Sequence, residues 1–183
     1  MREFIRNHRF LAWLSVGVVT FMTLFIVVWF EPHKLFIEET VSEAPPSSRP
    51  SNGPAASGGK ATTDDKPSLV AEGRFESLEH STSGTARVLE LADGRRFLRL
   101  EDLDTSNGPD LRVYLSEIPA SDDWYAYGER YIDLGALKGN RGDQNYEVPT
   151  DTDLSRYESV VVWCRRFTVG FGVAGLKFVD RPG

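Results

Sequence analysis

Three stretches with different hydrophobic patterns follow one another along the chain. Residues 10–30 are apolar and carry no charged side chain over 21 positions. Residues 41–68 are rich in Pro, Ser, Gly and Ala and hold almost no large apolar side chain. From residue 69 onward, short β-branched or aromatic runs recur about every ten residues between Gly, Pro, Asp and Asn. The pattern predicts an apolar helix, an unstructured connection and a β-rich domain, in that order.

The C-terminal part contains eight runs with strand character. Asp93-Gly94, between the second and third runs, is a turn signal for a two-residue hairpin. No helical period persists over three turns, although residues 120–129 could hold a short helical turn. We therefore predict an all-β fold, an antiparallel β-sandwich or partly closed barrel of about eight strands. The predicted strands are residues 73–78, 84–91, 95–100, 110–116, 131–134, 145–148, 158–164 and 168–179.

The last two predicted strands carry the most specific pattern. Residues 158–164 are apolar on both faces, which is typical of a central strand covered on each side. In the next strand, Gly170 and Gly172 share one face, where their small size lets another backbone or a large ring approach closely. Trp163 is a candidate for that space, and tight core packing is the simpler interpretation.

Residues 10–30 fit a membrane-spanning helix. At about 1.5 Å per residue they are long enough to cross a hydrocarbon core of about 30 Å. A cleaved signal peptide would have a shorter apolar core and a small-x-small cleavage site, which the chain lacks after residue 27. Arginines at positions 2, 6 and 9 favour a cytoplasmic N-terminus for residues 1–9. We therefore expect a single-pass protein of the cell membrane, with its C-terminal domain, residues 69–183, outside the cytoplasm.

Residues 31–68 would join this anchor to the domain as a juxtamembrane segment and a linker. The linker cannot bury enough apolar surface to offset the entropy of ordering its backbone, so we expect it to be disordered. Its prolines should stiffen parts of it toward the extended polyproline form.

Charge and cysteine count narrow the chemistry. The formal net charge of −6 is opposite to the basic footprint of nucleic-acid-binding proteins, so no nucleic-acid partner is expected. The chain has one cysteine, Cys164, which is therefore a buried filler, an intermolecular link or a reactive centre. Arg165 and Arg166 beside it favour the reactive thiolate, whereas Val162 and Trp163 indicate apolar burial, which disfavours it. Structural and redox interpretations both stay open.

Metal and cofactor chemistry is limited by the same composition. Without Cys-x-x-Cys, thioredoxin-type exchange and covalent c-type haem attachment are excluded. The predicted domain contains one histidine, His80, fewer than blue-copper or structural zinc sites need, so no metal site is expected. A thiolate alone can ligate haem iron, so haem stays open although no porphyrin pocket can be recognised. His80 lies in a polar turn and is either a surface residue or a partner of Cys164.

Four ordered motifs span residues 71–179. They are His80-x-x-x-Gly84; Asn107-Gly108-Pro109-Asp110-Leu111-x-Val113-Tyr114-Leu115-Ser116; Leu137-Lys138-Gly139-x-x-Gly142-x-Gln144-x-Tyr146; and Val161-Val162-Trp163-Cys164-x-x-Phe167-x-Val169-x-Phe171-Gly172-x-Ala174-x-Leu176. Together they resemble the DM-thirteen domain, the electron-transfer domain of Skeletor-like proteins. The resemblance implies a β-rich domain whose characteristic cysteine, at the position of Cys164, acts in redox chemistry. Larger relatives carry cytochrome-like modules, so here the resemblance implies a separate redox protein as partner.

The leading hypothesis is a membrane-anchored extracytoplasmic domain with a redox or electron-transfer role centred on Cys164. His80, Trp163 and Arg166 are its candidate neighbours, and the cofactor is not identified. The alternative is a non-redox binding or interaction module of the cell surface in which Cys164 is structural. The aromatic run Trp124-Tyr125-Ala126-Tyr127 would then be either core or an exposed recognition patch. Enzymatic activity beyond electron transfer is not expected, because no nucleophilic triad can be identified.

Overall fold

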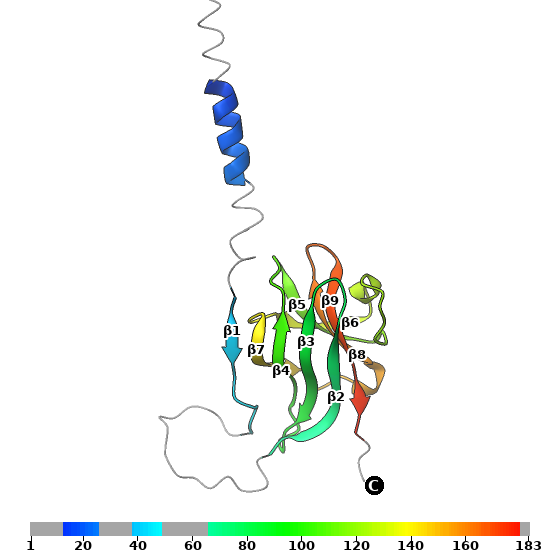
Figure 1. The fold of residues 1–183 in the computed structure, drawn as a ribbon. Helices are drawn as coiled ribbons and strands as arrows, with labels where there is room; N and C mark the ends of the chain where they lie inside the picture. The colour runs from blue at the N-terminus through cyan, green and yellow to red at the C-terminus, as the bar shows by residue number, and fades with distance from the viewer. Residues whose placement is uncertain (1–12, 26–37, 49–65, 180–183) are drawn as a thin grey trace, which may run out of the picture. The chain divides into compact units, whose positions relative to one another are not determined.

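The computed structural model describes residues 13–25, 38–48 and 66–179, which are drawn in colour in Figure 1. The chain divides into two compact units, Met1–Ile37 and Glu38–Gly183. Residues 13–25 are helical, and the rest of the predicted span, residues 10–12 and 26–30, lies outside the described part. Within the described ranges, no helix combines the length and the apolar character that crossing a bilayer requires.

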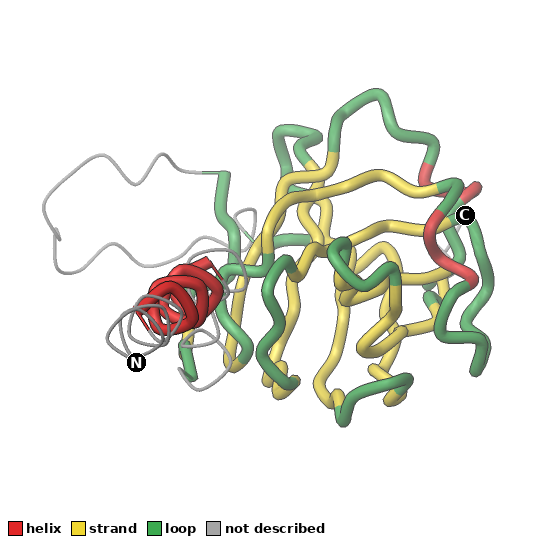
Figure 2. The backbone as a smooth tube through the Cα atoms, turned by 90° about the horizontal axis from the view of Figure 1, so that it is seen from above, coloured by secondary structure: helices red, strands yellow, loops and turns green. Residues whose placement is uncertain are grey.

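The second unit is all-β, as predicted, and forms a half-barrel of two sheets that share strand β2. The first sheet has the order β1-β7-β4-β3-β2, with β10 also beside β2, and the second has the order β2-β9-β8-β5-β6. Figure 1 shows the first sheet toward the viewer, and Figure 2 shows in green the loops that join the strands. The strands are β1 Thr40–Ser42, β2 Ser68–Ser77, β3 Thr82–Glu90, β4 Arg96–Thr105, β5 Leu111–Ser116, β6 Tyr131–Ala136, β7 Arg141–Val148, β8 Ser159–Cys164, β9 Val169–Gly175 and β10 Lys177–Phe178.

The eight predicted runs correspond to β2 through β10, with the last run divided into β9 and β10. The β3–β4 hairpin is confirmed, but its turn is longer than the two residues predicted. Leu91 N donates to Arg95 O at 2.9 Å, and Gly94 has a φ of 85°. Three residues therefore form the loop, and a glycine in the left-handed region completes it.

Two buried clusters explain why β8 is apolar on both faces. All six of its residues are buried, as predicted for a central strand. Val160, Val162 and Cys164 point into the core between the two sheets. Val161 and Trp163 point to the outer face of the second sheet, where residues 117–130 cover them. That loop contributes Tyr127 from η3 (Ala126–Gly128), a short helical turn in the region where one was expected.

The small residues of β9 accept neighbours other than the one expected. A Cβ atom built on Gly170 would lie 2.6 Å from Leu78, and one on Gly172 would lie 2.5 Å from Thr82. These two side chains fill the space for which Trp163 was a candidate, so that candidate is wrong. The glycines serve core packing.

The start of the predicted linker is also wrong, because residues 38–48 belong to the β unit. β1 pairs in parallel with the edge of β7, with Thr40 opposite Arg141 and Ser42 opposite Asp143. Its run Thr-Val-Ser is too short to stand out beside the prolines that follow, and its partner lies about 100 residues away. Of the rest of the predicted segment 31–68, residues 31–37 and 49–65 lie outside the described part, and its last residue, Ser68, begins β2.

Candidate functional site

Cys164 ends β8 and is completely buried. Its backbone pairs with Leu111 of β5 on one side and Val169 of β9 on the other. Its side chain is a free thiol in the apolar core between the sheets. Of the two environments that the sequence left open for Cys164, the structure has the apolar, buried one, so a reagent in solution cannot touch the thiol in the closed structure.

His80 lies at the same end of the core, in the loop between β2 and β3. Its ring packs on Phe171 with centroids 3.9 Å apart and an interplanar angle of 39°. Its Nε2 atom is 2.9 Å from the carboxylate of Glu79. Phe171 belongs to the same buried cluster as Cys164. Among the described residues no hydrogen bond joins His80 to Cys164, although His80 packs on a member of the cluster that contains the thiol.

The other two candidate neighbours lie apart from the thiol. Trp163 points to the opposite face of β8 and packs against Tyr114, with ring centroids 6.1 Å apart. Arg166 is exposed in the turn that follows β8. The adjacent Arg165 donates from Nε to Asp110 at 2.8 Å, and this hydrogen bond and the charge of Asp110 raise the pKa of Arg165. The chain therefore surrounds Cys164 with apolar groups and places its nearest cations outside the core.

A pocket of about 290 Å³ opens on the Trp163 side of β8. Tyr114 and Tyr131 stack in its wall, with centroids 3.9 Å apart and planes 8° from parallel. Burial of the Tyr114 phenol and its hydrogen bond with Tyr131 raise the pKa of Tyr114. The full lining is Tyr114, Tyr125, Gly128, Tyr131, Trp163, Arg165 and Thr168.

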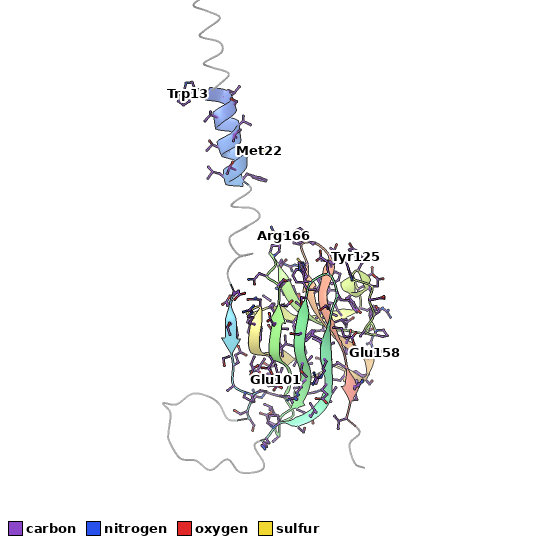
Figure 3. All side chains as sticks on the ribbon, viewed as in Figure 1. Trp13, Met22, Glu101, Tyr125, Glu158 and Arg166 are labelled. Atoms are coloured by element: carbon purple, nitrogen blue, oxygen red, sulfur yellow. The ribbon has the colours of Figure 1, made fainter. Side chains whose placement is uncertain are left out.

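The aromatic run Trp124 to Tyr127 is partly core and partly exposed. Tyr127 is fully buried, whereas Tyr125 is 67 % exposed and Trp124 is 42 % exposed. Figure 3 shows Tyr125 at the end of the domain where Arg166 also lies. The aromatic composition indicated this region, but the pocket itself depends on pairing between β5, β6 and β8, which no single stretch of sequence contains.

Two strained backbone positions flank the pocket. Arg130, next to Tyr131, has a φ of 54°, and Thr168 in the lining has a φ of 53°. Side-chain-bearing residues occupy this left-handed region at a cost of about 1–3 kcal/mol and concentrate at binding sites. The surrounding structure therefore holds the mouth of the pocket in a conformation that these residues do not prefer.

Comparison with protein families decides the identity of the β unit. The family model "Electron transfer DM13" matches residues 74–176, more than half of the chain. The chain belongs to the DM13 family. The DM13 match begins inside β2 and ends before β10, so it contains Cys164, His80 and the aromatic pocket, but not β1.

Comparison with individual proteins adds little to the DM13 assignment. No curated protein matches the chain. Among solved structures, a mutant of superoxide dismutase 5 from Candida albicans is similar, with a TM-score of 0.47 and 13 % identity. That match covers 63 % of this chain and 96 % of the dismutase. A likeness at this level does not establish a shared fold or activity.

The DM13 motif between Lys138 and Tyr146 is a buried polar network. Gln144 is fully buried and donates from Nε2 to Gly139 O at 2.6 Å. Its Oε1 atom accepts from the Tyr146 hydroxyl at 2.7 Å and from Lys138 N at 3.1 Å. Burial raises the pKa of Tyr146, so the hydroxyl stays a donor. Because every polar atom of the Gln144 amide end has a partner, the motif fixes the loop before β7 and has a structural role.

The described residues contain no group of three or more His, Cys, Asp or Glu side chains that could hold a metal ion. Haem does not fit at Cys164 either. The thiol has no exposed surface, and its neighbours on β5 and β9, Leu111 and Val169, are themselves buried. A porphyrin would have to displace these core side chains, at the cost of the apolar burial that stabilises the two sheets.

Proposed function

We propose that this chain is a membrane-anchored, extracytoplasmic DM13 protein with an electron-transfer role centred on Cys164. The observation that carries the proposal is the match to the electron-transfer family over residues 74–176, which includes this cysteine. The apolar stretch 10–30 and the arginines before it support the anchor and its orientation. The helix over residues 13–25 is consistent with that stretch.

The burial of Cys164 determines how electrons reach it. With one cysteine in the chain, oxidation to a disulfide needs a thiol from a second molecule, and the closed core excludes such a molecule. Trp163 is bonded to Cys164 through the backbone and borders the aromatic pocket. The pocket is therefore the surface through which an external redox protein would accept one electron from the thiol, whose proton would pass to solvent, and would return that electron in the reverse step.

Voltammetry of the full-length protein in lipid nanodiscs tests this role. The wild type should give a reversible wave that is absent from Cys164→Ser and Cys164→Ala, while Phe167→Ala, in the exposed turn nearby, keeps it. Coloured cofactors absorb between roughly 350 and 700 nm, so the absorbance of the purified protein in this range checks whether a cofactor contributes to the wave. A silent wild type, or the same wave in both Cys164 variants, contradicts the proposal.

The pocket favours a second candidate function, a binding module in which Cys164 is structural. Its exposed rings, Tyr125 and Tyr131, offer surface to a flat ring above the buried Trp163, and pockets of roughly 300 Å³ suit a small ligand. Arg165 at the rim opposes an ammonium ligand, so an uncharged or anionic aromatic compound is the better fit.

Gly128 offers a direct test of this second function. A Cβ atom there would lie 3.5 Å from the Trp163 ring, an ordinary contact, so Gly128→Leu should fill the pocket without straining the fold. Titration with 2-naphthol, followed by the NMR signal of the Trp163 indole N–H, should saturate in the wild type and weaken at least about tenfold in Gly128→Leu. Choline should leave the signal unchanged. Equal binding by both proteins contradicts the pocket as the site.

A further inference from the structure

β1 is held on the edge of β7 by its backbone. Arg141 N donates to Glu39 O at 3.2 Å, and Glu43 N donates to Asp143 O at 3.0 Å. These bonds extend the parallel register beyond both ends of the three-residue strand. Gly142 of β7 has a φ of 91°, and a Cβ atom on it would collide with the carbonyl oxygen of Val41. The edge of β7 is therefore shaped to let an extended backbone approach closely.

Side chains of the β unit also form hydrogen bonds with residues 39–43, which contain β1. Glu43 accepts from Lys138 Nζ and from Asn145 N, both at 2.7 Å. The buried guanidinium of Arg99 donates to Glu43 O at 3.0 Å, and Asn140 Oδ1 accepts from Glu39 N at 2.8 Å. Desolvation opposes ionisation of Glu43, but the bonds from Lys138 and Asn145 outweigh it and lower the pKa of Glu43. These six polar contacts hold a strand that buries little apolar surface.

The residues that contact β1 lie inside the DM13 match, whereas β1 itself lies outside it. Arg99, Lys138, Asn140, Gly142 and Asn145 all lie within the DM13 match, whereas β1 precedes it. β1 reaches β2 through residues 43–67, a connection of 25 residues counted inclusively. Loop-closure entropy grows slowly with length, so docking of β1 across this connection costs only a few kcal/mol. A three-residue edge strand also opens at low free energy compared with the core.

We propose that β1 is a clasp that sets how far the DM13 domain can reach from the membrane. The proposal rests on the membrane anchor at residues 10–30. With β1 docked, residues 31–37, seven residues, separate the anchor from the β unit, a maximum of about 25 Å. With β1 released, residues 31–67, 37 residues, separate the anchor from β2, a maximum of about 125 Å. The docked clasp restricts the domain to partners at the membrane surface, and the released clasp extends it toward partners farther away.

The test releases β1 by substitutions in the β1 segment itself. Glu39 and Glu43 both donate backbone hydrogen bonds to the β unit, and proline has no N–H, so the double variant Glu39→Pro, Glu43→Pro should release β1. The matched control is Ser51→Pro, Ala55→Pro, which adds two prolines to a stretch already rich in them. Glu43→Ala, a milder variant, removes only the side-chain contacts.

Reach is measured on full-length protein in phosphatidylcholine vesicles that contain a headgroup-labelled acceptor lipid. A donor dye is placed at Asp122→Cys, an exposed loop position, while Cys164 stays protected by burial. Energy transfer should fall in the double proline variant, fall partly in Glu43→Ala, and stay at the wild-type value in the control. Near-ultraviolet circular dichroism should be the same in all four proteins.

Each other outcome identifies the part that fails. Protein that does not float with the vesicles contradicts the anchor, and with it the reach. Protein that floats but shows equal energy transfer in wild type and the double proline variant contradicts the clasp alone. If the double proline variant loses the native circular dichroism, Glu43→Ala decides. Unchanged energy transfer in that variant, together with unchanged hydrogen exchange of the backbone amide at position 43, would contradict the clasp.

Discussion

Cys164 and Trp163 are neighbours on β8, yet the two faces of that strand differ in kind. The Cys164 face points into the core between the sheets, where apolar side chains enclose the thiol. The Trp163 face points to the outside of the second sheet, where aromatic rings border a pocket that opens to solvent. Only one peptide unit of β8 therefore separates the buried thiol of Cys164 from the pocket that Trp163 lines. Any redox role of this cysteine has to be considered together with the Trp163 ring.

The largest effect should come from opening the insulated face. Phe171 is 2 % exposed, packs on His80 and belongs to the buried cluster of Cys164, so Phe171→Ala should destabilise the fold by about 3–5 kcal/mol and leave a cavity in that cluster. Urea unfolding measures the stability, and the rate of reaction with a thiol reagent measures access to Cys164. The reaction rate should rise at least tenfold, on the order of what a 1.4 kcal/mol change in opening free energy gives.

Phe167→Ala is the matched control for that variant. Phe167 is 55 % exposed in the turn after β8, so its loss should change stability by no more than about 0.5 kcal/mol. The thiol should stay as slow to react as in the wild type. Fast reaction of the wild type itself would show that the Cys164 face is not closed in solution.

Substitution of the thiol should have the next largest effect. Cys164→Ser places a hydroxyl in an apolar core and should cost about 1–3 kcal/mol if the hydroxyl lacks a partner. Cys164→Ala removes one heavy atom and should cost about 1 kcal/mol. Urea unfolding of both variants decides the order, and a serine variant as stable as the alanine variant would contradict an apolar site.

The pocket face should instead respond to alkaline pH. Because burial and Tyr131 raise the pKa of Tyr114, the folded chain keeps this proton at a pH where the unfolded chain has lost it. The contribution of Tyr114 to the free energy of unfolding is therefore fully present below about pH 10, the ordinary pKa of tyrosine, and is lost as the pH rises above that value. Between about pH 8 and pH 11, the free energy of unfolding should fall less steeply with pH in Tyr114→Phe than in the wild type. Equal slopes would contradict the shift.

The smallest effect on stability should come from the rim of the pocket. Tyr125 is mostly exposed, so Tyr125→Ala should change the unfolding free energy by no more than about 0.5 kcal/mol. If the ring serves ligand contact, the same variant should weaken 2-naphthol binding several-fold. A large loss of stability would instead assign Tyr125 to packing.

The sequence predicted the parts of this molecule that depend on local pattern. Alternation and turn residues identified the strands from β2 onward, and the two-sided apolar run identified β8 as a central strand. It could not reveal β1, because three residues carry no period and the glycine that receives them lies about 100 positions away. The pocket was missed for the same reason, since Tyr114, Gly128 and Trp163 meet only after β5 and β8 pair.

The place of β1 has a consequence for solubility. Without it, β7 would end the first sheet with a row of backbone donors and acceptors open to any extended chain, the usual template for aggregation. β1 covers those groups, is itself only three residues long, and has Glu39 and Glu43 beside its ends. Short length and negative charge both discourage a further strand from adding. Production of the domain without residues 38–48 would therefore expose an aggregation-prone edge that the docked clasp covers.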